Sequence, residues 1–180
     1  MLSSIRLHQL IDEGVIDALH ENVNAASIDV RLSPQILLEG IPEGPVDIAN
    51  KQSPKFYPMD IPEEGFIIHP DEIFLGSTIE TFNLPDTISA KFYLRSSVGR
   101  CFLEHMQAGF IDAGFNNAQL TLELKNMTQY HKLRIRAGMR IGQIVFFEHE
   151  NTGSDSYRIK GNYNLQKGPT KAFHGTGHGA

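Results

Sequence analysis

The stretch that decides the fold is residues 94–126, which reads LRSSVGRCFLEHMQAGFIDAGFNNAQLTLELKN. It opens with two guanidiniums, two hydroxyls and a glycine within six residues, namely Arg95, Ser96, Ser97, Gly99 and Arg100. Such a cluster suits a phosphate chain, because arginine supplies paired donors while hydroxyls and exposed backbone amides fill the gaps. The start of the stretch therefore predicts a phosphate-binding segment.

A turn and a strand, each with one carboxylate, complete the stretch. The turn is AGFIDAGF at residues 108–115, where Asp112 stands among apolar and glycine positions. The strand QLTLEL at residues 119–124 alternates in polarity and carries Glu123. Alternation of this kind is typical of a half-buried β-strand. Basic cluster, Asp turn and Glu strand together predict a nucleoside triphosphate site built on β-structure.

The segments around the stretch favour a mainly β fold with few helices. Residues 4–19 have a helical period that ends near the Asp12-Glu13-Gly14 sequence. Residues 26–32, 88–93, 132–136 and 139–147 read as strands, and residues 33–70 read as short strands joined by long surface loops without recognisable chemistry. Many short strands separated by turn signals predict a sandwich or barrel.

Length and composition predict one β domain, residues 1–150, followed by a tail, residues 151–180. The tail is rich in Gly, Ser, Asn and Lys, so it is expected to order against the rest of the molecule rather than fold alone. No apolar run approaches a membrane span and no signal-peptide pattern is present. We therefore expect a soluble, cytoplasmic protein with no membrane partner.

Charge and cysteine content narrow the class of partner. The net charge of −5 argues against nucleic-acid binding but leaves a triphosphate ligand compatible with a local arginine cluster. Cys101 is the only cysteine, which excludes an internal disulfide and suits a reducing compartment. We expect its side chain to be a small buried apolar group.

Five blocks resemble the signature blocks of deoxycytidine triphosphate (dCTP) deaminases, within the trimeric deoxyuridine triphosphatase (dUTPase) superfamily. They are RSSVGR, AGFIDAGF and TLELKN in the central stretch, ASIDVRL at residues 26–32 and QKGPT at residues 166–170. The blocks follow the family's order over most of the chain. The resemblance implies a distorted jelly-roll or β-barrel of the dUTPase-like type with peripheral short helices. It also implies a homotrimer with sites at the subunit interfaces.

The resemblance implies deamination of dCTP to dUTP, a step toward dTTP in pyrimidine deoxynucleotide metabolism. Zinc deaminases need a P-C-x-x-C box, which a chain with one cysteine cannot contain. The metal-free alternative is a carboxylate that takes a proton from the attacking water and returns it to the leaving nitrogen. Mg²⁺ is expected to bridge the phosphates with few protein ligands and no direct protein site.

Glu123 is the candidate for that carboxylate. Desolvation on an apolar strand favours a neutral carboxyl, which suits a residue that accepts and returns a proton. The alternative is a surface glutamate opposite the strand's leucines. Ser96 and Arg100 correspond to family residues that position the water and the base. Asp112 corresponds to one that holds the sugar 3′-hydroxyl or orients a second water, although an aspartate in such a turn is also a common turn cap.

The resemblance also assigns substrate contacts across the stretch and the tail. Arg95 and Ser97 hold phosphate oxygens, and the aspartate equivalent to Asp29 lies near the metal and phosphates; the alternative places Asp29 on a solvated strand face. The remaining contacts are Gly99, Ala108, Phe110, Thr121 and Leu122 in the stretch, and Tyr157, Tyr163, Gln166 and Lys167 in a tail that closes over the nucleotide. The glycine-rich end, residues 173–179, is expected to be disordered.

Phe110 stands where monofunctional family members often carry a basic residue, so the AGFID form favours bifunctional members that also release dUMP and pyrophosphate. Three departures from the family pattern bear on the base pocket, on phosphate binding and on inhibition by dTTP. The segment between Arg100 and Asp112 is one residue shorter, which leaves the match of His105 to the family's trigger histidine open. Gln107 replaces a threonine, and Asn162 replaces a lysine for which Lys160 or Lys167 can substitute.

Two other functions remain open at this point. One is a pure dUTP diphosphatase, against which stand Phe115, where those enzymes usually carry tyrosine, and Glu123, which they lack. The other is a catalytically silent β module that binds a nucleotide as a sensor.

Overall fold

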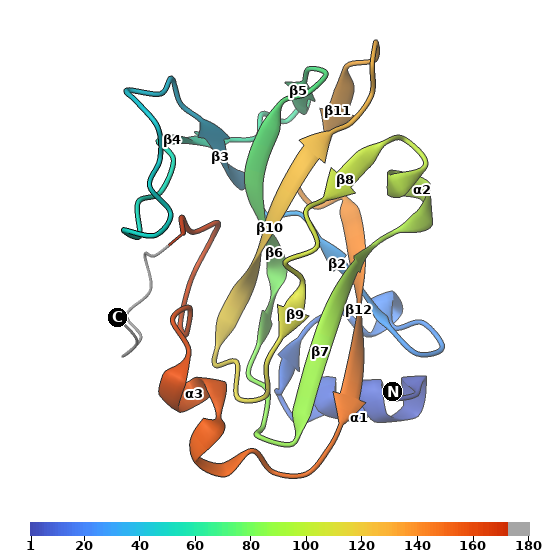
Figure 1. The fold of residues 1–180 in the computed structure, drawn as a ribbon. Coiled ribbons are helices and arrows are strands. Elements are labelled where there is room, and N and C mark those ends of the chain that lie inside the picture. Colours follow the sequence, from blue (N-terminus) through green and yellow to red (C-terminus); the bar gives the residue numbers. More distant parts are fainter. Residues whose placement is uncertain (173–180) are drawn as a thin grey trace.

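The computed structural model describes residues 1–172, which build two main antiparallel sheets (Figure 1). The larger sheet has the strand order β4 (Phe56–Asp60), β3 (Gln35–Glu39), β6 (Ile73–Phe82), β10 (Ala118–Asn126) and β8 (Leu103–His105), and β1 (Ile16–Asp17) also pairs with β6. The second sheet has the order β2 (Ile28–Arg31), β12 (Arg140–Glu148), β7 (Ile88–Leu94) and β9 (Phe110–Ile111). A small ribbon pairs β11 (Leu133–Ile135) with β5 (Phe66–Ile68).

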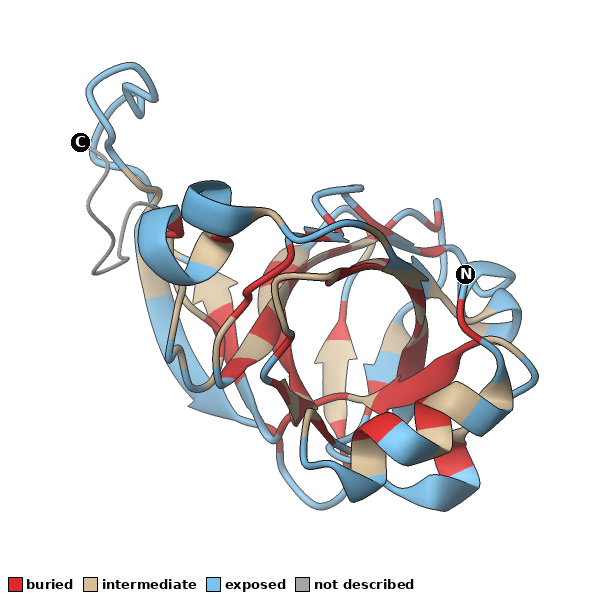
Figure 2. Ribbon diagram, turned by 90° about the horizontal axis from the view of Figure 1, so that it is seen from below, coloured by how far each residue is buried: buried red, intermediate tan, exposed pale blue. Residues whose placement is uncertain are grey.

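The core lies between the two main sheets. On β10 the side chains of Leu120, Leu122 and Leu124 are buried while Thr121 and Glu123 are only partly covered, as expected for a strand with one face against the core. Large apolar side chains from other strands, such as Phe74 and Phe146, meet them there. Figure 2 shows the buried residues gathered on the strands around the centre and the exposed ones on the outer helices and loops. The predicted mainly β, barrel-like fold is confirmed.

A bulge in β6 joins the two sheets. Gln119 of β10 faces Thr81, but Thr121 faces Ser77, so β6 uses two more residues than β10 over this interval. The Thr78 hydroxyl accepts a hydrogen bond from the Leu120 amide at 3.0 Å and so replaces a missing ladder bond. Bulges of this kind re-aim side chains and bend a strand.

The bulge aims Glu80 at β2. Its fully buried carboxylate accepts hydrogen bonds from the backbone N–H and from Nε of Arg31, both at 2.8 Å. A buried carboxylate is costly without such partners, and the loss of one partner costs about 3–5 kcal/mol. Glu80 and Arg31 therefore form a fixed link between the larger sheet and the second sheet.

Short helices surround the sheets, as predicted. α1 (Ser4–Asp12) ends where the sequence indicated and buries Leu7 and Leu10. The others are η1 (His20–Asn22), α2 (Ser96–Gly99), η2 (Gly153–Asp155) and α3 (Tyr157–Lys160). Among residues 1–172 no helix combines the length and the apolar character needed to cross a membrane.

Two expectations about single residues are resolved by the fold. Asp29 is only 3% exposed, so the interpretation that placed it on a solvated strand face is wrong. Cys101 is exposed, which contradicts the expected burial, because it lies in the turn between α2 and β8 rather than in a strand. The prediction for residues 173–179 lies outside the described residues.

Candidate active site

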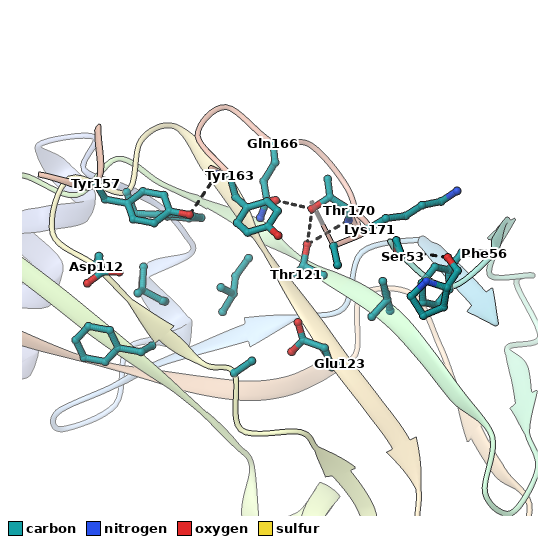
Figure 3. Close-up of a pocket in the computed structure, with 18 residues that line it drawn as sticks. Ser53, Phe56, Asp112, Thr121, Glu123, Tyr157, Tyr163, Gln166, Thr170 and Lys171 are labelled. Atoms are coloured by element: carbon teal, nitrogen blue, oxygen red, sulfur yellow. Dashed lines mark hydrogen bonds between the residues drawn. The ribbon is translucent and has the colours of Figure 1, made fainter. Parts of the chain in front are cut away.

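A pocket of about 430 Å³ opens over the partly exposed face of β10 (Figure 3). Thr121 and Glu123 of β10 form its floor, and Asp112 stands at one end with Tyr157. The opposite end is formed by residues of the β3–β4 connection and of β4. The lining residues are Ser53, Pro54, Phe56, Leu75, Ala108, Phe110, Ile111, Asp112, Phe115, Leu120, Thr121, Glu123, Tyr157, Tyr163, Gln166, Thr170, Lys171 and Ala172.

Glu123 points into this pocket with a side chain that is 31% exposed. Its Oε2 lies 3.3 Å from Nε2 of His105, a nearly buried side chain whose ring packs on Phe92 with 4.7 Å between the centroids. The contact becomes an ion pair when the imidazole is protonated. Within residues 1–172 neither of these two atoms makes a hydrogen bond of good geometry. The carboxylate is therefore partly desolvated and has free capacity for a proton or a water.

Asp112 is held at the pocket's end by a tight turn. The Phe115 amide donates to the Asp112 carbonyl oxygen at 3.1 Å, and Gly114 adopts a φ of +85°. A side chain at Gly114 would also collide with Ser156 and Asp86, so both conformation and space require glycine there. The carboxylate itself is exposed toward the pocket, where it can accept a hydrogen bond.

The C-terminal segment closes one side of the pocket. We call residues 163–172 the strap. β8 pairs with β10 only at residues 124–126, which leaves the edge of β10 near Gln119 open. The strap takes that edge: the Gln119 amide donates to the Gln166 carbonyl at 3.1 Å, and Nε2 of Gln166 donates to the Gln119 carbonyl at 2.5 Å. Both backbone groups of Gln119 are thus paired at this edge.

Side chains fix the strap further. The Oε1 atom of Gln119 accepts from the Gly168 amide at 2.5 Å, while its Nε2 donates to the Ile79 carbonyl at 3.2 Å. The Thr170 amide donates to the Thr121 hydroxyl at 3.2 Å, and the Thr170 hydroxyl donates to Oε1 of Gln166 at 2.6 Å. The side-chain amide of Gln166 is thus occupied by strap contacts.

Tyr157 anchors the start of the strap. Its ring lies 5.5 Å from that of Phe115, and its hydroxyl oxygen accepts from the Tyr163 amide at 3.2 Å. Burial raises the pKa of the Tyr157 phenol above its ordinary value, so this group stays neutral at neutral pH.

The basic cluster lines a different depression, of about 380 Å³. It contains Asn24, Asp29, Arg95, Ser96, Ser97, Arg100 and Gln143, none of which lines the Glu123 pocket. The Asp29 carboxylate lies 3.4 Å from Nε of Arg95 and accepts a hydrogen bond from Asn24 at 3.0 Å. In Figure 1, α2 lies to the right of β8 while the C-terminal segment lies to the left of β10. The two depressions therefore share no lining residue among the described residues.

A family model described as dCTP deaminase-like matches residues 1–149. The chain belongs to the dCTP deaminase family. It is 38% identical over 154 residues to the dCTP deaminase, dUMP-forming, of Pseudarthrobacter chlorophenolicus, which covers 82% of this chain and 80% of that protein. It is 39% identical over 156 residues to the protein of the same name from Bifidobacterium longum, and this match covers 83% of this chain and 80% of that protein.

The fold agrees with a solved member of the dCTP deaminase family. The structure of 2′-deoxycytidine 5′-triphosphate deaminase from Agrobacterium tumefaciens aligns with a TM-score of 0.65 at 22% sequence identity. The alignment covers 81% of this chain and 47% of that longer chain. At this identity the match supports the fold alone.

The predicted site residues of this dCTP deaminase family member divide between the two depressions. The Glu123 pocket brings together Ala108, Phe110, Asp112, Thr121, Glu123, Tyr157, Tyr163 and Gln166. The other depression holds Arg95, Ser96, Ser97 and Arg100. Leu122 has its side chain in the core, and Gly99 and Lys167 line neither.

Sequence reasoning missed one wall of the pocket. Ser53, Pro54 and Phe56 come from the segment in which no chemistry was recognised, and Lys171 comes from the strap. Phe56 reaches the pocket because β4 pairs with β3 and β3 pairs with β6, next to β10. Such non-local pairing leaves no local signal in the sequence.

Replacing Gln119 by alanine is expected to loosen the strap. The variant loses the hydrogen bonds to Gly168 and Ile79, each worth about 0.5–1.5 kcal/mol. Backbone amides of residues 166–170 should then exchange with solvent about tenfold faster, as measured by hydrogen–deuterium exchange with mass spectrometry. Gln9→Ala, a matched change on α1, should leave that exchange unaltered. Equal protection in the Gln119 variant and the parent would contradict the assigned strap contacts.

Proposed function

We propose that this chain deaminates dCTP at C4 of the cytosine and cleaves the triphosphate, so that it releases dUMP and pyrophosphate. The observation that carries the proposal is the partly desolvated Glu123 carboxylate inside a pocket that Asp112 and the strap also line. The identity of 38–39% to relatives named dCTP deaminase, dUMP-forming, supports the choice of substrate and products.

Glu123 serves as the general base and acid of the deamination step. It takes a proton from water as the water oxygen bonds to C4 and the C4=N3 double-bond electrons move to N3, then gives that proton to the amino nitrogen. The C4–N bond to the amino group breaks to release ammonia, and the remaining hydroxyl proton passes to N3, which leaves the uracil carbonyl at C4. The position of the carboxylate supports this role, because it points into the pocket and its Oε2 has no hydrogen-bond partner among the described residues. His105 lies against the same carboxylate, with 3.3 Å between its Nε2 and Oε2 of Glu123.

Asp112 and the aromatic groups beside it suit the sugar and the later step. The exposed carboxylate can accept a hydrogen bond from the 3′-hydroxyl or orient a second water. That water attacks the α-phosphorus and pyrophosphate leaves, with charge on the phosphoryl oxygens stabilised by cations. Phe110, in place of a basic residue, supports the bifunctional assignment.

The complete site is proposed to form between two chains of a homotrimer. Ser96 and Arg100, the residues expected to position the water and base, lie in the other depression of the same chain. A neighbouring chain can bring its basic cluster to the Glu123 pocket. We call these two depressions the half-sites, and within a single chain they lie apart. In a closed cyclic trimer every Glu123 pocket would receive the basic cluster of one neighbouring chain.

Mg²⁺ is proposed to act with the phosphates. Residues 1–172 contain no cluster of three or more His, Cys, Asp or Glu side chains arranged to hold a metal ion. Mg²⁺ in nucleotide sites is commonly bound through phosphate oxygens and water, with one or two protein carboxylates. Asp29 is the carboxylate nearest to the basic cluster, and it is engaged by Arg95. When bound, Mg²⁺ neutralises charge on the triphosphate.

The biological setting follows from the same proposal. The products feed dTTP synthesis, so dTTP is a proposed inhibitor at the same pocket. The single cysteine suits a reducing compartment, and we place the enzyme in the cytoplasm.

Glu123→Gln is predicted to abolish ammonia release from dCTP while nucleotide binding is retained. The amide keeps the shape of the side chain but cannot shuttle a proton, a loss of about 10²–10⁴-fold in rate. Ammonia release would be followed in a coupled assay and dCTP binding by calorimetry. Glu63→Gln, an exposed loop substitution of the same kind, is the control. Normal ammonia release by the Glu123 variant would refute its role as the base.

Mixing two inactive variants is predicted to restore activity. Glu123→Gln and Arg100→Ala each spoil one half-site, so randomly mixed cyclic trimers recover about a quarter of wild-type activity. The variants would be co-refolded and assayed against each variant refolded alone. A mixture with no more activity than its components would contradict a site shared between chains.

A further inference from the structure

Arg140, at the start of β12, lies beside the basic cluster although it belongs to none of the blocks that carry the family resemblance. Its Nη1 atom is 3.6 Å from Oδ2 of Asp29, the same oxygen that lies 3.4 Å from Nε of Arg95. Asp29 is only 3% exposed, so this carboxylate is a fixed point on which two guanidiniums converge.

Arg140 extends the basic cluster into a second depression. This hollow, of about 460 Å³, is lined by Leu19, Glu21, Asn22, Arg31, Gly138 and Arg140, so it holds two arginines and one carboxylate. The strand register places Arg140 opposite Arg31, and like charges in that position destabilise a strand pair. Arg31 has its own counter-charge in Glu80, whereas Arg140 shares Asp29 with Arg95.

The charge around Asp29 is therefore positive and incompletely neutralised. One carboxylate faces two guanidiniums, and the Arg100 side chain lies in the same depression as Arg95. The molecule as a whole carries −5, so this patch stands out as the place for an anion.

The guanidinium of Arg140 is free to take a ligand. Its side chain is 51% exposed, and Asp29 contacts only one of its terminal nitrogens. Arginine offers five donors in a rigid fork that matches phosphate oxygens. Because Asp29 attracts this group from 3.6 Å, the guanidinium is kept near the basic cluster before a ligand arrives, which lowers the entropic cost of binding.

We propose that Arg140 binds the terminal phosphate of the nucleotide and forms, with Arg95, a two-arginine clamp oriented by Asp29. This assignment rests on the proposed function, which places the triphosphate at the cluster containing Arg95, Ser96 and Ser97. It adds a binding residue on β12, outside the central stretch, and gives Asp29 the role of a positioning residue. The ligand chemistry is the doubly charged end of a polyphosphate.

The test uses Arg140→Ala with two probes, inorganic tripolyphosphate and dCTP with Mg²⁺. Loss of a charge-assisted hydrogen bond should raise the tripolyphosphate dissociation constant, measured by calorimetry, about tenfold or more. The KM for dCTP should rise by a similar factor with little change in kcat, while inhibition by deoxycytidine, which has no phosphate, stays unchanged. Asp29 keeps Arg95 and Asn24 as partners, so folding is preserved.

Two further variants make the result decisive. Arg136→Ala removes the same charge from an exposed residue just after β11 and should leave both constants unaltered. Arg140→Lys keeps the charge but loses the fork, so it should give an intermediate dissociation constant. Tripolyphosphate binding by the Arg140 and Arg136 variants with equal affinity would overturn the proposal. So would an equal loss of deoxycytidine and tripolyphosphate binding, because that would mean a purely structural role.

The two proposals can fail separately. If wild-type protein binds tripolyphosphate through Arg140 but leaves dCTP unchanged, the proposed function fails and the clamp stands as an anion site. If dCTP is converted but Arg140→Ala behaves as Arg136→Ala, the clamp fails alone.

Discussion

The bulge in β6 is the constraint on which the rest of the structure depends. It places the Glu80 carboxylate where it accepts hydrogen bonds from the backbone N–H and the side chain of Arg31. It also places the Thr78 hydroxyl where it accepts a hydrogen bond from the Leu120 amide. Residues 77–81 of β6 thus connect the two sheets and support β10 just before Thr121 and Glu123. Because the buried carboxylate cannot lose its partner cheaply, the strand that carries the candidate base is held in one register.

That register also explains why Glu123 lies away from the basic cluster. Period-two alternation on β10 forces Glu123 to the face opposite the buried leucines, where the strap and the β3–β4 wall meet it. The basic cluster follows β7 in the second sheet and ends up around Asp29 instead. Within residues 1–172 the Glu123 pocket and the depression of the basic cluster share no lining residue.

Features that depend on short stretches of sequence could be predicted from the sequence. Alternation around Glu123, the helix that ends near Gly14 and the glycine turn at Asp112 are short-range patterns, and each appears where it was expected. Features that depend on distant pairing were invisible. The burial of Asp29 needs β2 to pack beside β12, and the position of Phe56 in the pocket needs three strands to pair in order. The strap on Gln119 likewise depends on β8 being short.

The most direct test of the central claim is product analysis with dCTP. Purified protein would be incubated with dCTP and Mg²⁺, and the nucleotides resolved over time by ion-exchange chromatography. The account predicts dUMP and pyrophosphate in equal amounts, with ammonia released in step and no build-up of dUTP. Accumulation of dUTP alone would contradict the coupled cleavage, and unchanged dCTP would contradict the assignment of Glu123 as a deaminating base.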